Sequence, residues 1–179
     1  MSVRRVQRVP SDWPVVHLEA EVPGSVGAIV VDGLVAQPVR LSREDLAALG
    51  AGVHTIPVHC VWGWSRPGVR WEGVPLAAVL GLAVPLGGYV TVHSASGTYS
   101  SCLPLTDAAR GLLAWARDGE PLPPAAGGPL RYVAPGDHWA YKHVKWAERI
   151  TVGDRFVRGF WESKVDDPAG RIPDEVELP

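Results

Sequence analysis

The chain has 179 residues, of which 46% are hydrophobic and 20% charged, an ordinary composition for a globular protein large enough to bury a core. Its net charge of −2 at pH 7 gives it no general attraction for nucleic acid. No uncharged apolar run reaches the roughly eighteen residues of a membrane span, and no apolar signal segment follows the early arginines, so we expect no membrane span and a cytoplasmic location.

The 17 prolines and 20 glycines predict many turns and few long helices, and hence a β-rich fold. We expect an α+β protein, a single domain over 1–179 with mixed, mainly antiparallel sheets and short helices. An N-terminal arm over 1–25 and a mobile tail over 166–179 would flank its core.

The N-terminal half begins with an apolar run, 28–31, which is followed by Asp32-Gly33 and Leu34-Val35. This pattern predicts a hairpin with a type I′ turn. Ser42, with an acid three residues later, predicts a capped short helix. The run 53–60 predicts one buried strand, and Pro75 predicts the first position of a second short helix that ends at 82.

In the C-terminal half, the stretch before Asp118-Gly119 fits either a hairpin over 112–122 or a helix over 107–117, and the hairpin is the favoured alternative. The segment 123–129 is expected to be a loop. The other strands are predicted at 89–94, 98–103, 130–134 and 145–152.

Cys60 ends the predicted strand 53–60 and leads into a loop rich in Trp, Gly and Pro. A thiol on a loop at a strand end can act as a metal ligand or a nucleophile. Taken alone, however, a free cysteine is more often a small buried hydrophobe. Cys60 and Cys102 lack the C-x-x-C spacing of zinc or iron–sulfur sites.

The wider pattern around Cys60 is more specific. The segment HCVWGWSRPGVRWEGVPL (59–76) resembles the molybdenum-binding segment of the sulfite oxidase-type molybdopterin oxidoreductases. Further segments of the same family occur in the same order, namely LLAWARDGEPLP (112–123), GGPLRYVAP (127–135), YKHVKWAERI (141–150) and GFWE (159–162).

This resemblance implies a molybdenum–molybdopterin cofactor (Mo-MPT) without haem, and Cys60 as the protein ligand to molybdenum. A thiolate suits a soft metal. The pterin phosphate needs cationic side chains, and on the predicted strand His143 and Lys145 would share one face. A solvated strand edge is the alternative for these charges. The residues expected to bind the cofactor are His17, Ser94, Arg131, Lys142, His143, Val144 and Lys145.

The substrate pocket is expected on loops that flank the cysteine or that the family folds over the metal. Its expected residues are Trp62, Arg66, Tyr99, His138 and Trp139, whereas Trp64 is expected in the core. The motif around Cys60 resembles the non-sulfite, methionine-sulfoxide-reductase-like branch. Ala126 and Ala140 depart from the family pattern, which usually has Asn or His at the first position and often glycine at the second.

The resemblance implies two-electron oxygen-atom transfer on a small-molecule substrate, with electrons exchanged with a separate partner. The alternative is a protein of the same fold that binds or carries the cofactor without turnover. A cofactor-free thiol hydrolase using Cys60 and His59 is a third possibility. It has no evident orienting acid, and adjacent strand residues point apart.

Overall fold

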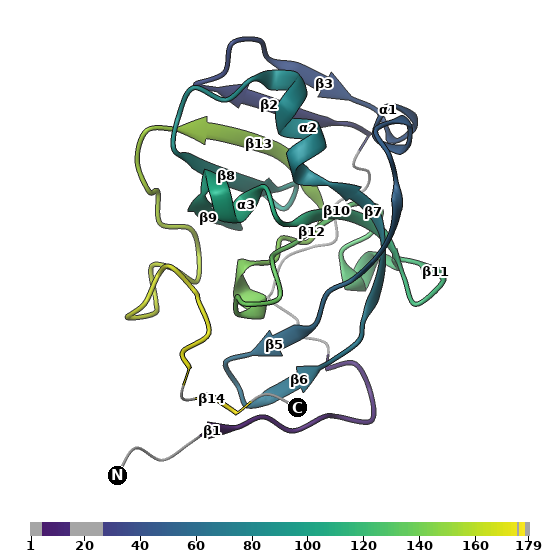
Figure 1. Cartoon of the computed structure of the whole chain (residues 1–179), viewed down its shortest axis with the longest axis vertical. Coiled ribbons are helices and arrows are strands. Elements are labelled where there is room, and N and C mark those ends of the chain that lie inside the picture. The colour runs from purple at the N-terminus through teal and green to yellow at the C-terminus, as the bar shows by residue number, and fades with distance from the viewer. Residues whose placement is uncertain (1–4, 15–26, 175, 178–179) are drawn as a thin grey trace.

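Two five-stranded sheets form the body of the molecule in the computed structural model, which describes residues 5–14, 27–174 and 176–177 (Figure 1). The first sheet has the order β3-β2-β13-β8-β9, with bounds Val39–Leu41, Ile29–Gly33, Ala147–Gly153, Tyr89–Ser94 and Ser100–Pro104. The second has the order β11-β10-β7-β4, with bounds Glu120–Pro121, Leu112–Arg117, Arg70–Pro75 and Gly52–Thr55, and β12 (Arg131–Val133) also pairs with β10.

Antiparallel pairing dominates both sheets, and β2 with β13 is a parallel pair. The helices are short: α1 (Arg43–Ala48), α2 (Leu76–Ala83), α3 (Leu105–Ala108), and the 3₁₀ turns η1 (Pro124–Ala126) and η2 (Ala140–Lys142). The predicted class, one α+β domain of mixed, mainly antiparallel sheets, is therefore confirmed. In the described part, no helix is long and apolar enough to cross a membrane.

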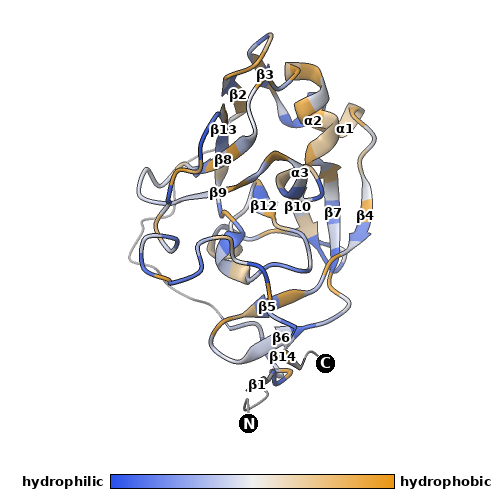
Figure 2. Cartoon of the chain, turned by 60° about the vertical axis from the view of Figure 1, so that its left-hand side comes forward, coloured by the Kyte–Doolittle hydropathy of each residue, from blue (hydrophilic) through white to orange (hydrophobic). Residues whose placement is uncertain are grey.

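Two small pairs of strands lie apart from these sheets. The antiparallel pair β5 (Val58–Cys60) and β6 (Trp64–Arg66) lies beyond the second sheet (Figures 1 and 2). The parallel pair β1 (Arg5–Val6) and β14 (Val176–Glu177) joins segments near the two ends of the chain. β14 lies within the predicted tail, and the mobility of that tail stays a prediction.

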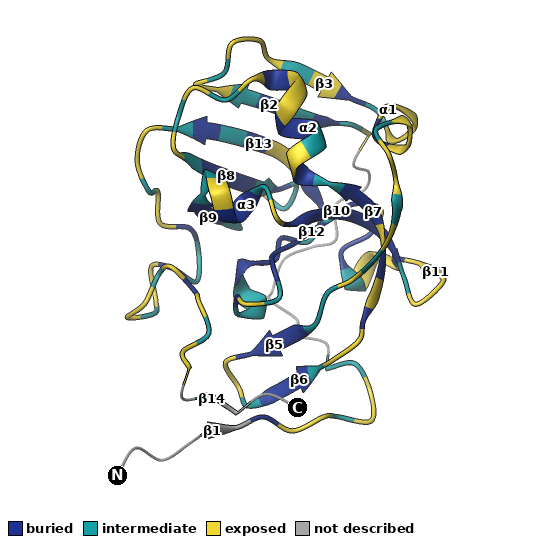
Figure 3. Ribbon diagram, in the orientation of Figure 1, coloured by how far each residue is buried: buried dark blue, intermediate teal, exposed yellow. Residues whose placement is uncertain are grey.

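The main core lies between the two sheets and α2. It includes Ile29, Val79, Leu113 and Tyr132, all of them with no exposed surface. Figure 3 shows β10 buried along almost its whole length, and it pairs with β7 on one edge and with β12 and β11 on the other. A second cluster around Trp71 and Val133 contains Cys60 and Trp64. The predicted core position of Trp64, which is 6% exposed, is confirmed.

Two predictions for the N-terminal half were wrong in detail. Asp32-Gly33 ends β2 without forming a tight turn, and the returning strand is β3 instead of 34–35. Gly33 has a φ of +87°, and a Cβ there would lie 2.3 Å from the Val152 carbonyl oxygen, so this glycine permits the close approach of β13. The predicted strand 53–60 is divided at Ile56-Pro57, because proline cannot donate to a ladder, and its halves join different partners.

Other local predictions hold. Ser42 caps α1 in a capping box with Asp45. Asp118 and Gly119, with φ of +54° and +91°, form the two-residue turn between β10 and β11, so the hairpin prediction is confirmed over the helix. α2 begins one residue later than predicted, because Pro75 is its N-cap.

The secondary structure predicted around the expected phosphate-binding residues was wrong. Residues 140–142 form η2, His143 is extended, and β13 begins only at Ala147. The alternation of strand side chains therefore does not place His143 and Lys145 on one face. Their relation is set by the turn that η2 makes and by the bridge between Val144 and Tyr132.

Candidate active site

Cys60 is the last residue of β5, and it is paired with Trp64 on β6. It is 8% exposed and packs in the second cluster. Burial raises the pKa of its thiol, which is therefore protonated at neutral pH when it has no metal partner. Its neighbour His59 is also buried, with Nδ1 2.6 Å from the Ser65 hydroxyl. The site thus starts from a sheltered thiol at the end of a strand in a two-stranded unit.

Arg131 and Lys145 converge on the 3₁₀ turn η1. Arg131 donates from Nη1 to the Ala126 carbonyl at 2.8 Å, and Lys145 donates from Nζ to the Ala125 carbonyl at 2.7 Å. Gly127 follows the turn with a φ of +98°, and a Cβ there would lie 2.8 Å from Lys145 Cγ. Only a glycine lets the turn approach the lysine stem this closely.

Arg131 is half-buried, and among the described residues no acidic side chain forms an ion pair with it. Burial is the main cause that lowers its pKa, to about 10, and the positive charge of Arg117 adds to it. Its Nε is buried and has no hydrogen-bond partner in the described part of the chain. Burial, with the positive charge of Arg131, lowers the pKa of Lys145 to about 8. Two cations thus face each other across one turn.

His143 completes this basic set. It is 4% exposed, and neither ring nitrogen has a hydrogen-bond partner among the described residues. Burial is the main cause that holds its pKa well below the ordinary range, and the positive charges of Arg131, His138 and His59 act in the same direction. Buried polar atoms are normally bonded. We call Arg131, His143 and Lys145 the basic cradle.

Lys142, also predicted to bind the cofactor, is engaged elsewhere. Its side chain is fully buried, and Nζ donates to Glu162 Oε1, to the Cys102 carbonyl at 2.6 Å and to the Pro168 carbonyl at 2.9 Å. These three acceptors use all the hydrogens of the ammonium group. Lys142 therefore belongs to a structural ion pair, and the structure does not bring its charge into the cradle.

The other residues that were predicted to bind the cofactor differ in their surroundings. Val144 is fully buried and exchanges backbone hydrogen bonds with Tyr132. Ser94 ends β8, where its hydroxyl accepts from the amide and hydroxyl of Ser96. It borders a shallow surface hollow together with Tyr99. His17 lies outside the described residues.

Among the predicted pocket residues, Tyr99 and His138 are fixed near the cradle. Tyr99 donates to the Tyr141 carbonyl at 2.5 Å, and the nearby Arg131 guanidinium partly offsets the rise in its pKa caused by burial. His138 is 1% exposed, with Nδ1 2.7 Å from Asp137 Oδ1 and Nε2 3.7 Å from Asp107 Oδ2.

The remaining pocket candidates differ in exposure. Trp62 is 60% exposed on the turn after Cys60. Arg66 donates to the Ser11 carbonyl at 2.8 Å and lies over the Trp13 ring, so its guanidinium contacts the N-terminal segment. Trp139 is half-buried, and its backbone forms a bridge with His59.

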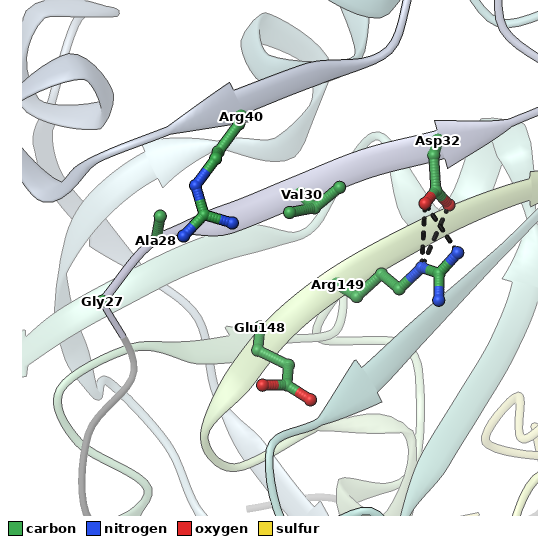
Figure 4. A pocket seen from close by; sticks show the side chains of 7 residues that line it. All are labelled: Gly27, Ala28, Val30, Asp32, Arg40, Glu148 and Arg149. Carbon is green, nitrogen blue, oxygen red and sulfur yellow. Dashed lines mark hydrogen bonds and ion pairs between the residues drawn. The ribbon is translucent and has the colours of Figure 1, made fainter.

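A further surface hollow does not coincide with these residues. It lies over β3, β2 and β13, where Arg40, Glu148 and the Asp32–Arg149 ion pair border it (Figure 4). None of the predicted site residues lines it, so its shape carries no information about Cys60.

Sequence reasoning gave no cofactor or structural role to two residues that organise this region. His59 is buried beside Cys60 and its ring contacts the Ser65 hydroxyl, although the sequence suggested it only as a partner for a hydrolase. Glu162, the last residue of GFWE, is 1% exposed and neutralises Lys142. The signal available in the sequence was an acid at the end of an aromatic, glycine-containing motif.

Comparison with known proteins identifies the family. Residues 23–161 match the family described as oxidoreductase molybdopterin binding domain. The chain belongs to this family. It is 38% identical to the uncharacterized oxidoreductase YuiH of Bacillus subtilis over 87% of this chain and 81% of that protein.

Other relatives and a solved structure agree with this assignment. The chain is 31% identical to the protein-methionine-sulfoxide reductase catalytic subunit MsrP of Gluconobacter oxydans, over 78% of this chain and 51% of that protein. It therefore spans about half the length of that relative. The sulfane dehydrogenase SoxCD of Paracoccus pantotrophus shares the fold, with a TM-score of 0.65 and 23% identity over 80% of this chain and 41% of that one. The predicted sulfite oxidase-type family and its methionine-sulfoxide-reductase-like branch are confirmed.

Proposed function

We propose that this chain is the catalytic core of a Mo-MPT-dependent oxidoreductase that transfers an oxygen atom in a two-electron reaction, with Cys60 as the protein ligand to molybdenum. The observation that carries the proposal is the basic cradle. It combines a buried histidine with a half-buried arginine and lysine, and both ring nitrogens of His143 lack a partner among the described residues. Such a set is costly unless an anion completes it.

The residues fit a phosphate-bearing pterin. Arg131 offers a planar fork of donors, Lys145 a mobile ammonium group, and His143 a ring nitrogen that can donate. Both cations already bond carbonyls of η1, so the turn that would border the pterin also positions them. Ala126, where the family usually has a polar side chain, contributes its carbonyl as the acceptor for Arg131.

Cys60 must give up a proton before it can bind a metal. Because burial raises its pKa, the proton stays on Sγ until a cation is present, and binding of the metal releases it. When bound, the molybdenum cofactor supplies the two-electron redox change and the position at which oxygen is transferred. The chain supplies one soft ligand, the charge that holds the pterin, and aromatic residues such as Trp139 and Tyr99 that would border the substrate.

The two cysteines of the chain provide a matched test. We expect Cys60→Ser to lose its molybdenum and all turnover, because a hydroxyl is a poor ligand for a soft metal. Cys102→Ser is the control: Cys102 is fully buried on β9, and its sulfur accepts from the Val157 amide. Metal analysis of both folded variants decides the matter, and full molybdenum occupancy with activity in Cys60→Ser would contradict the proposal.

A further inference from the structure

Four aromatic or aliphatic side chains gather on the surface beside Cys60. Trp62 is 60% exposed and Val61 42% exposed on the turn between β5 and β6, which Figure 3 shows in the colour of exposed residues. The Trp62 ring meets Trp161 edge-on at 6.3 Å between centroids, and Trp161 meets Phe160 at 5.4 Å. We call Val61, Trp62, Phe160 and Trp161 the aromatic patch.

This patch is not needed to fill the core. Phe160 and Trp161 are half-buried, and Trp62 extends from a turn whose backbone is already closed by the hydrogen bond from the Gly63 amide to the Cys60 carbonyl. A group of exposed large apolar side chains usually marks an interaction site. Tryptophan and phenylalanine are enriched in protein interfaces, where tryptophan in particular carries much of the binding energy.

Positive charge borders the patch. Lys164 Nζ lies 4.9 Å above the Phe160 ring, and Arg158 Nη1 donates to the Glu162 carbonyl at 3.2 Å. Both side chains are exposed. The one carboxylate between them in sequence, Glu162, faces inward to Lys142, so it does not neutralise this rim.

The patch is also held in place before any partner arrives. Glu162 accepts from the Ser101 hydroxyl and the Cys102 amide, both at 2.8 Å, and from the Gly159 amide. These bonds tie the segment that carries Phe160 and Trp161 to β9. A surface that is ordered in advance loses less entropy on association.

We propose that the aromatic patch with its rim of Lys164 and Arg158 docks an acidic protein that carries a one-electron redox centre. This inference rests on the proposed function, because oxygen-atom transfer requires an electron partner. In the direction of oxidation, substrate X and water give XO, two protons and two electrons, and the carrier accepts one electron in each of two encounters. In the opposite direction it donates them. Trp62 is two residues from Cys60, so a carrier seated here approaches the metal ligand.

The test measures the binding of two acidic carriers, a flavodoxin and a plant-type ferredoxin, to the purified holoprotein by surface plasmon resonance. A basic cytochrome c serves as the probe of opposite charge. We expect Lys164→Glu and Arg158→Glu to weaken binding of the acidic carriers on the order of tenfold at low salt, mainly through slower association. High salt should remove this difference. Arg40→Glu on β3, with the same change of charge outside the patch, should bind like wild type.

A second variant separates the apolar contact from the charges. Trp62→Ala should speed dissociation of the acidic carriers and leave the salt dependence of association unchanged. Three results would overturn the inference: absence of binding by both acidic carriers, equal binding by the charge-reversed variants, or self-association of the chain that Trp62→Ala abolishes.

Failure of the proposed function would look different. Turnover with a small uncharged electron mediator should be the same in wild type and Lys164→Glu, because the mediator does not use the rim. Holoprotein without molybdenum or without mediator-driven turnover would disprove the catalytic role. Carrier binding that responds to Lys164→Glu and not to Arg40→Glu supports the docking surface whichever result the mediator gives.

Discussion

Lys142 and His143 are adjacent in the chain and equally buried, yet they belong to opposite kinds of environment. Every hydrogen of the Lys142 ammonium has a protein acceptor, and Glu162 supplies the opposite charge. His143 has no bonded ring nitrogen among the described residues, and burial is the main cause that holds its pKa well below the ordinary range.

The difference separates a charge that the protein itself neutralises from a polar group whose hydrogen bonds are kept for a ligand. Folding removes both groups from water, which costs free energy in each case. Around Lys142 the protein itself offsets that cost. In the basic cradle it does not, and a bound anion would. The experiments below test this distinction, beginning with the largest expected effect.

Breaking the Lys142–Glu162 pair should be costly for the fold. Glu162→Gln leaves a buried ammonium without its counter-charge, and we expect it to lower the free energy of unfolding by about 3–5 kcal/mol. Urea unfolding of the cofactor-free protein measures this. Asp32→Asn, which breaks the pair with Arg149 (57% exposed), is the control and should cost under about 1 kcal/mol. Equal costs in the two variants would show that the buried pair is not special.

Removing a charge from the basic cradle should weaken cofactor binding and leave the stability of the fold almost unchanged. Arg131→Gln keeps a donor for the Ala126 carbonyl and removes a half-buried cation. We expect cofactor binding to weaken by about 1.5–3 kcal/mol, whereas the stability of the cofactor-free protein changes by less than about 1 kcal/mol. Pterin released by acid from the purified protein, together with urea unfolding, gives both quantities. A large loss of stability with unchanged pterin content would place Arg131 with Lys142 as a structural charge.

The sequence predicted this contrast only in part. The fold class, the hairpin at Asp118-Gly119 and the buried strand end at Cys60 followed from local patterns, because turn chemistry and apolar runs act over a few residues. The division of the strand at Pro57 and the parallel approach of β13 to Gly33 depend on partners distant in sequence, which no local pattern specifies.

The candidate site shows the same limit. The resemblance placed Lys142, His143 and Lys145 together because they are close in sequence. Their separation into two environments arises from η2 and from Glu162, twenty residues further on. Burial and hydrogen-bond partners distinguish a ligand-binding lysine from a structural one, and a sequence motif contains neither.

The smallest expected effect concerns pH and Lys145. Burial lowers the pKa of Lys145 to about 8, so above this pH the free site loses its charge and must take up a proton to bind a phosphate. Cofactor affinity should therefore fall as pH rises above 8, by at most about tenfold, or 1.4 kcal/mol, per pH unit. In Lys145→Arg the guanidinium stays charged, so this loss should disappear. Deprotonation of Cys60 favours metal binding as pH rises in both proteins alike, and the difference between them isolates Lys145.

The cofactor-free proteins give a second measurement. Because the unfolded lysine, with a pKa near 10.4, binds more protons than the folded one, the stability of wild type should rise relative to Lys145→Arg between about pH 8 and 10. Parallel pH profiles for the two proteins in both measurements would show that the charge of Lys145 is not kept for an anion.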